Sequence, residues 1–135
     1  MLTRRNFSAC AICAVAGFAA TAIGEAQAET PGLKRTILQK MEFPDNYVTI
    51  TALVEIDPRA AVARHTHPGI ETVYVLDGEF ELAVKGDPAR KLKTGDSFHV
   101  LREVPHGARN GDKPTRLSVT YVVDKDKPLA SPAPE

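Results

Sequence analysis

The stretch HTHPGIETVYVLDG, residues 65–78, decides how this chain is expected to fold. On an extended strand, residues two apart project from the same face, about 7 Å from one another along the chain. His65 and His67 have this spacing, so both imidazoles can reach one metal ion at roughly 2.1 Å. Pro68-Gly69 then offers a bend that returns Glu71 to the same point. The stretch therefore predicts a metal site built from two histidines and a carboxylate.

The end of the same stretch predicts a β-hairpin. Asp77-Gly78 lies between two β-rich runs and favours a two-residue type I′ turn. The resulting register sets Val75 opposite Phe80 and Glu71 opposite Val84, and paired residues share a face of the sheet. A carboxylate on an inward face is costly unless a charged or hydrogen-bonding group meets it, so Glu71 needs a partner inside. The expected inward face comprises Val73, Val75, Phe80, Leu82 and Val84, and the outward side chains are Tyr74, Leu76, Glu79 and Glu81.

The remainder of the chain also reads as strands. Apolar residues alternate with others from Val48 to Ile56, which is the period-two pattern of a strand with one buried face. Further strand candidates are 34–41, 97–101 and 117–123. Many short strands, frequent turns and no amphipathic helix predict an all-β sandwich or barrel.

A third imidazole from a distant strand would complete the site, and His106 is the best candidate for it. Three neutral imidazoles and one carboxylate suit ions such as Mn, Fe, Ni or Zn. Such a set leaves one or two coordination positions open for water or substrate, as catalytic sites require. The fourth histidine, His99, is left open, because strand parity allows it to face either the pocket or the outside.

Two motifs resemble those of the cupin superfamily. His65-x-His67-x3-Glu71-x6-Gly78 is similar to the first, and Gly95-Asp96 followed by Pro105-His106 and Asn110 is similar to the second. The resemblance covers most of the segment 47–123. It departs from the usual pattern where Arg59 replaces a glycine, and where Leu101 and Glu103 replace a proline and a glycine.

The resemblance implies a fold, a ligand set and a function. The fold is a double-stranded β-helix, or jelly-roll barrel, with one divalent ion on His65, His67, Glu71 and His106. Gly78 would form the turn, and Asn110 would hold a structural position. The implied function is a small metal-dependent enzyme, foremost an oxygenase and then an isomerase or decarboxylase, with Glu71 as the catalytic base. The alternative is a non-catalytic protein that binds a small molecule or a metal.

The resemblance also implies a homodimer, with Tyr74 and Leu76 as candidate interface residues. The partner otherwise expected is a small organic ligand or substrate. Lys plus Arg and Asp plus Glu are balanced at 17 each, and no basic cluster indicates nucleic-acid binding.

Residues 1–28 have the pattern of a cleavable signal peptide. Arg4 and Arg5 precede an Ala-rich apolar run that is too short for a convincing membrane span, and Ala26-Gln27-Ala28 has the small-x-small form of a cleavage site. The paired arginines followed by Phe7 resemble a twin-arginine export signal, and an ordinary secretory signal is the alternative. We therefore expect a periplasmic or secreted protein without stable membrane insertion. The expected division is a signal peptide (1–28), an N-terminal segment with the first strand (29–46), the barrel (47–123) and an irregular tail (124–135).

Overall fold

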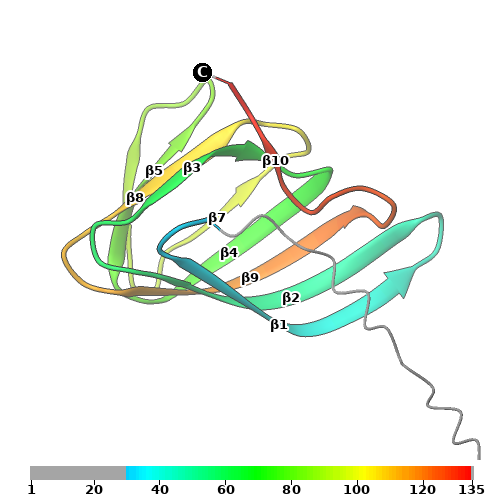
Figure 1. The fold of residues 1–135 in the computed structure, drawn as a ribbon, viewed down its shortest axis with the longest axis horizontal. Helices are drawn as coiled ribbons and strands as arrows, with labels where there is room; N and C mark the ends of the chain where they lie inside the picture. Colours follow the sequence, from blue (N-terminus) through cyan, green and yellow to red (C-terminus); the bar gives the residue numbers. More distant parts are fainter. Residues whose placement is uncertain (1–29, 135) are drawn as a thin grey trace, which may run out of the picture.

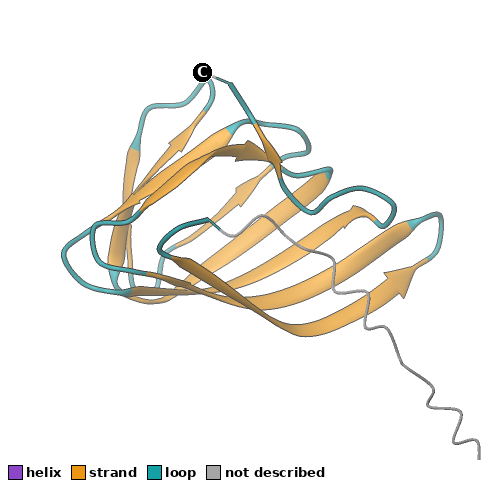
Figure 2. Ribbon diagram, viewed as in Figure 1, coloured by secondary structure: helices purple, strands orange, loops and turns teal. Residues whose placement is uncertain are grey.

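The computed structural model describes residues 30–134, and this range contains strands and loops but no helix (Figure 2). The predicted signal peptide lies outside the described residues. Within them, no helix is long and apolar enough to cross a membrane. The strands are β1 Leu33–Phe43, β2 Tyr47–Ile56, β3 Ala61–Thr66, β4 Gly69–Asp77, β5 Glu79–Val84, β6 Arg90–Lys93, β7 Ser97–Val100, β8 His106–Asn110, β9 Thr115–Asp124 and β10 Ser131–Pro132.

The strands form two five-stranded sheets that face each other (Figure 1). The first sheet has the order β1-β2-β9-β4-β7 and the second has the order β10-β3-β8-β5-β6, with antiparallel pairing throughout. After β2 the chain passes repeatedly from one sheet to the other, which is the winding of a double-stranded β-helix. The all-β jelly-roll fold expected from the sequence is therefore confirmed.

The core lies between the sheets and follows the predicted alternation. On β2, every second residue from Val48 to Ile56 is buried, and the residues between them are only partly covered. Burying one such aliphatic side chain stabilises the fold by about 1.5–3 kcal/mol. The inward residues of β4, β5 and β9 complete this core: Val73, Val75, Phe80, Leu82, Leu117, Val119, Tyr121 and Val123.

The predicted β-hairpin at Asp77-Gly78 is wrong. The strand β4 pairs with β7 and β9, whereas β5 pairs with β6 and β8 in the other sheet. Gly78 is therefore a corner at which the chain changes sheets. Its φ of 95° favours glycine, and a Cβ atom there would lie 2.4 Å from Thr115 Oγ1. The predicted faces are nevertheless right, since Val75 and Phe80 both point into the core while Tyr74 and Leu76 are exposed.

Two departures from the cupin motifs fall at backbone positions that favour glycine. Arg59 has a φ of 61° and Glu103 a φ of 57°, in the left-handed region that non-glycine residues seldom adopt. The backbone N–H of Glu103 donates to the carbonyl of His67 at 3.0 Å. The chain thus keeps the turn geometry that the usual glycine would allow, and this turn supports a predicted metal ligand.

The C-terminal segment is more structured than its prolines indicated. Ser131 pairs with Thr66 and Pro132 with His65, so β10 adds a short edge strand to the second sheet. Leu129 belongs to the hydrophobic core. The strand β10 lies beside β3 in Figure 1.

Candidate metal centre

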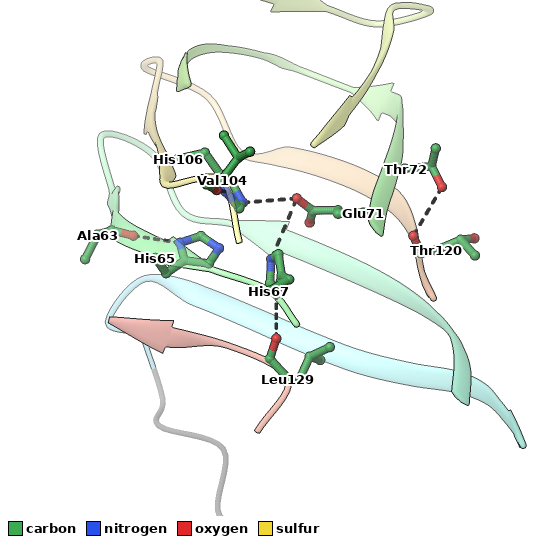
Figure 3. Close-up of polar contacts among 9 residues, drawn as sticks. All are labelled: Ala63, His65, His67, Glu71, Thr72, Val104, His106, Thr120 and Leu129. Carbon is green, nitrogen blue, oxygen red and sulfur yellow. Dashed lines mark hydrogen bonds and ion pairs between the residues drawn. The ribbon is translucent and has the colours of Figure 1, made fainter. Parts of the chain in front are cut away.

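The structure brings together the four side chains singled out by the sequence (Figure 3). His65 on β3 and His106 on β8 are direct cross-strand partners, and their ring centroids are 4.3 Å apart. His67 follows the end of β3, and its ring centroid is 5.1 Å from that of His106. One ring nitrogen from each histidine lies within 4.8 Å of the others, which is close enough for the three to share one ion.

Glu71 approaches the histidines from the opposite sheet. Its Oε2 atom lies 3.1 Å from His106 Nε2 and 3.7 Å from His67 Nε2. The carboxylate is buried, as the inward parity of β4 predicts. The site therefore lies where the chain crosses between sheets, with His65 and His106 on one side, Glu71 on the other and His67 in the crossing segment.

Backbone carbonyls fix the tautomers of the three imidazoles. The Nδ1 atoms of His65, His67 and His106 lie 2.8, 2.6 and 3.0 Å from the carbonyl oxygens of Ala63, Leu129 and Val104. A carbonyl can only accept, so each neutral ring donates from Nδ1–H and carries its lone pair on Nε2. This arrangement presents all three Nε2 lone pairs for coordination.

The Nε2 atoms of His67 and His106 show why the residues fit a metal ion. Both atoms are buried; Nε2 of His67 has no hydrogen-bond partner among the described residues, and Nε2 of His106 faces the Glu71 carboxylate at 3.1 Å. Buried polar atoms normally have partners because leaving one unsatisfied costs about 1–3 kcal/mol. An ion between these nitrogens and Glu71 would satisfy both. The donor set of imidazole nitrogens and one carboxylate is also what first-row divalent ions prefer.

The charge states of His65, His67 and Glu71 favour metal binding. Burial lowers the pKa of His65 to about 4 and also lowers that of His67, so both rings are neutral near pH 7. Burial acts to raise the pKa of Glu71, but contacts with His106 and His67 outweigh it and the net shift is downwards. For His106 the effect of burial is outweighed by the Glu71 carboxylate, which raises its pKa. Binding of a metal ion requires the neutral form of this ring, so the ion and a proton would compete for His106.

A cavity of about 720 Å³ opens beside the histidines. Its size lies within the usual range for sites that bind small molecules. Both sheets and the segment 125–132 contribute to its wall. The polar side of the wall includes His65, Glu71, His106, Arg35 and Tyr121, and the apolar side includes Phe80, Leu82, Phe98, Leu117 and Val119.

Two residues of this wall were missed by the sequence reasoning, Tyr121 and Arg35. Tyr121 on β9 is the cross-strand neighbour of Glu71, is only 1% exposed, and has its ring centroid 5.0 Å from that of His67. Burial, followed by the charge of Glu71, raises the pKa of Tyr121, so its hydroxyl stays protonated. The guanidinium of Arg35 lies 5.7 Å from the centre of the tyrosine ring, within cation–π range. The alternation of β9 carried a signal for Tyr121, because it places this hydroxyl among the apolar inward residues Leu117, Val119 and Val123.

His99 and Asn110 do not belong to the group of candidate metal ligands. His99 is exposed on β7, opposite Thr72, so the structure places it outside the cavity wall. Asn110 is buried, and its Nδ2 group donates to the carbonyls of Ile56 and Asp57 at 3.0 and 2.8 Å. It also accepts from Thr115 Oγ1 at 2.7 Å. Asn110 therefore links the end of β2 to the start of β9, in keeping with the structural role that the resemblance implied.

Comparison with known families and structures agrees with this architecture. The profile of the cupin domain matches residues 52–123. An RmlC-like cupin from Shewanella frigidimarina superposes with a TM-score of 0.56 and 30% identity, over 70% of this chain and 79% of that one. An uncharacterised protein from Klebsiella pneumoniae with a double-stranded β-helix domain gives a TM-score of 0.62 at 23% identity, over 79% and 89% of the two chains.

A curated relative is dimethylsulfoniopropionate lyase DddQ from Ruegeria pomeroyi. The chain is 35% identical to it over 57 residues, which are 42% of this chain and 28% of the lyase. The crystal structure of that lyase superposes with a TM-score of 0.66 at 23% identity, over 75% of this chain and 51% of the other. The similarity thus spans less than a third of the curated relative's sequence and about half of its crystallised chain.

Proposed function

We propose that this chain, which belongs to the cupin family, is a metal-dependent enzyme that cleaves a small organic carboxylate by elimination. The observation that carries the proposal is the convergence of three Nε2 atoms and the Glu71 carboxylate, with His65, His106 and Glu71 lining a cavity. The similarity to a dimethylsulfoniopropionate lyase favours lyase chemistry among the reactions that such a site supports.

The ligands proposed for the ion are His65, His67, Glu71 and His106. A divalent ion bound there, Mn, Fe, Ni or Zn, would supply Lewis acidity to an oxygen of the substrate. The carbonyl-bound Nδ1 atoms would keep the rings turned towards it.

The cavity wall supplies a cation for the substrate's carboxylate. Arg35 lies at this wall beside Tyr121, so its guanidinium is placed to pair with an anionic group inside the cavity. The apolar side chains opposite, Phe80 and Phe98, exclude water from the rest of the substrate. A small molecule with a carboxylate and an apolar body therefore matches the wall better than a neutral sugar.

Glu71 is also the proposed catalytic base, a role open to its carboxylate when it is not bound to the ion. Its lowered pKa keeps it ionised near pH 7, the form that accepts a proton. Glu71 would take a proton from the carbon next to the carboxylate. The electron pair of that C–H bond forms a C=C bond, and the group on the next carbon leaves with its own bonding pair. Tyr121 lies across the β4–β9 pair from Glu71. Its neutral hydroxyl would donate a hydrogen bond that holds the Glu71 carboxylate in place.

Replacing Glu71 by Gln tests the assignment. The change keeps the side chain's shape and removes its basicity, so in variant protein that keeps its metal, turnover of sulfonio- or other β-substituted propionates should fall by about 10²–10⁴-fold. The Glu81→Gln variant, altered at an exposed carboxylate on β5, is the matched control and should keep full activity. Full turnover in Glu71→Gln would refute the base role. Oxygen consumption with phenols or diketones, in place of elimination, would favour the oxygenase reaction expected from the sequence.

The non-catalytic alternative and twin-arginine export can each be tested. A metal-loaded protein that turns over none of these compounds would support the non-catalytic alternative. Export by the twin-arginine route is tested by fusing residues 1–32 to a reporter and comparing export with each pathway blocked.

A homodimer is proposed from the outward face of the first sheet. Its exposed side chains include Ile70, Tyr74 and Leu76 on β4, and Met41 and Phe43 on β1. Light scattering of the purified protein would show whether two copies associate.

A further inference from the structure

The segment 125–132, called the C-terminal strap below, crosses from the end of β9 to the edge of β3. Its residues line the cavity, and Leu129 is buried in the core at 7% exposure. At its far end, β10 pairs with β3, and the N–H of Ala133 donates to the carbonyl of Arg64 at 3.1 Å. The strap is thus fixed at Leu129 and at β10.

The strap orients one histidine, while the other two are oriented locally. His65 and His106 each donate to a carbonyl two residues earlier in the chain, at Ala63 and Val104. His67 instead donates to the carbonyl of Leu129, 62 residues further along, at 2.6 Å (Figure 3). The orientation of His67 therefore depends on the strap, whereas that of the other two does not.

The Leu129 side chain sets the place of this carbonyl. Prolines at 128 and 132 restrict the backbone of the strap but add no N–H donors to it. The buried leucine side chain supplies the packing that holds this stretch against the barrel between its two ends. Removing that packing frees the carbonyl to move away from His67.

We propose that the strap is a positioning element of the metal centre, with Leu129 as the positioning residue for His67. This inference rests on the metal site proposed above. When the strap detaches, His67 loses the partner that selects its tautomer and ring orientation. Loss of such an orienting partner typically weakens metal binding by about 10–100-fold.

The test compares Leu129→Ala with Leu92→Ala in the full chain. Both leucines are 7% exposed members of the same core, but Leu92 lies on β6 and does not line the cavity. Zn²⁺ affinity, measured by competition with a chromophoric chelator, should fall 10–100-fold in Leu129→Ala and stay within about twofold of wild type in Leu92→Ala. Leu129→Met, which restores the apolar anchor, should recover most of the affinity. Equal affinity in the two alanine variants would overturn the proposal.

A second measurement does not depend on the metal. In ¹⁵N NMR spectra of the metal-free protein, Leu129→Ala should change the ring nitrogen signals of His67 and leave those of His65 and His106 unchanged. Unchanged His67 signals would overturn the positioning role even if affinity fell. Absence of Zn²⁺ binding by wild type, with a shifted His67 signal, would refute the proposed metal function and support the role of the strap.

The coupling must also act in the reverse direction. If the strap favours metal binding, bound metal stabilises the strap by the same free energy. In wild-type protein, Zn²⁺ should slow hydrogen exchange at the Ala133 amide by about 10-fold or more, and leave the turn amide of Asp87, which bonds Val84, unaffected. This measurement stands even if Leu129→Ala fails to fold. No change at Ala133 in a protein that binds Zn²⁺ would contradict the proposal.

Discussion

Replacing Gly69 by Ala should disable the metal centre without touching a ligand. Gly69 lies between His67 and Glu71, where β4 passes close to β9. A Cβ atom at this position would lie 2.0 Å from the carbonyl oxygen of Val122 and 2.6 Å from Val123 Cα. Ordinary contact begins at 3.4 Å, so the two strands must separate by about 1.4 Å to accept a methyl group. Both obstructing atoms are backbone, so no side-chain rotation relieves the overlap.

The expected loss of metal affinity and activity follows from the separation of the two strands. A functional site tolerates misplacement of about 0.5 Å, and a shift of about 1 Å can cost 10²-fold in rate. We expect Gly69→Ala to lose at least tenfold in Zn²⁺ affinity and about 10²-fold in kcat/KM. Overpacking should also lower the free energy of unfolding by about 1–3 kcal/mol. Isothermal titration measures the affinity, steady-state kinetics measures kcat/KM, and denaturant unfolding measures the stability.

Gly86→Ala is the control. Gly86 has a φ of 92°, but a Cβ atom there meets nothing within 4 Å. The left-handed backbone should cost about 1–2 kcal/mol of stability while metal affinity stays unchanged. If Gly69→Ala bound metal as tightly as Gly86→Ala, the argument that the β4–β9 contact positions Glu71 and His67 would be refuted.

Three further predictions concern other residues. Asn110→Ala should lower the free energy of unfolding by about 2–4 kcal/mol in denaturant titrations, because the carbonyls and the Thr115 hydroxyl that it satisfies lose their partner; an unchanged midpoint would contradict the structural role. Tyr121→Phe should keep metal affinity within about threefold and lower kcat about tenfold or more, since it removes the hydroxyl beside Glu71. An unchanged kcat would show that this hydroxyl does not hold the Glu71 carboxylate. Arg102, with Lys127 adding to its effect, lowers the pKa of Asp124, so this carboxylate stabilises the fold above its unfolded pKa and the benefit disappears as pH falls through its lower folded value. The difference in Tm between wild type and Asp124→Asn should therefore shrink from pH 7 to pH 2.5, and a constant difference would contradict the ion pair.

The strand faces and the grouping of His65, His67 and Glu71 were predictable because they depend on short-range periodicity, whereas His106 was found through the resemblance to the second cupin motif. Residues two apart on a strand share a face whatever that strand pairs with, so the inward side of Glu71 followed from the local pattern. The same property explains the wrong hairpin. Val75 and Phe80 point inward whether their strands pair directly or lie on facing sheets, so alternation cannot distinguish a hairpin from a corner between sheets.

The parts of the site that were not predicted depend on long-range contacts. The carbonyl of Leu129 reaches His67 from 62 residues away, and a backbone acceptor has no signature in sequence. Arg35 enters the cavity wall from β1, a strand whose register shifts between Ile37 and Gln39. Such a shift moves one residue out of step, so the face of a side chain on this strand cannot be read from alternation alone.

The most direct test of the account is a crystal structure of the metal-loaded protein, with anomalous scattering recorded at the absorption edge of the added ion. We predict one anomalous peak per chain, about 2.0–2.2 Å from the Nε2 atoms of His65, His67 and His106 and from a Glu71 oxygen. A peak elsewhere in the molecule, or no peak at this point in crystals grown with excess metal, would contradict the proposed centre.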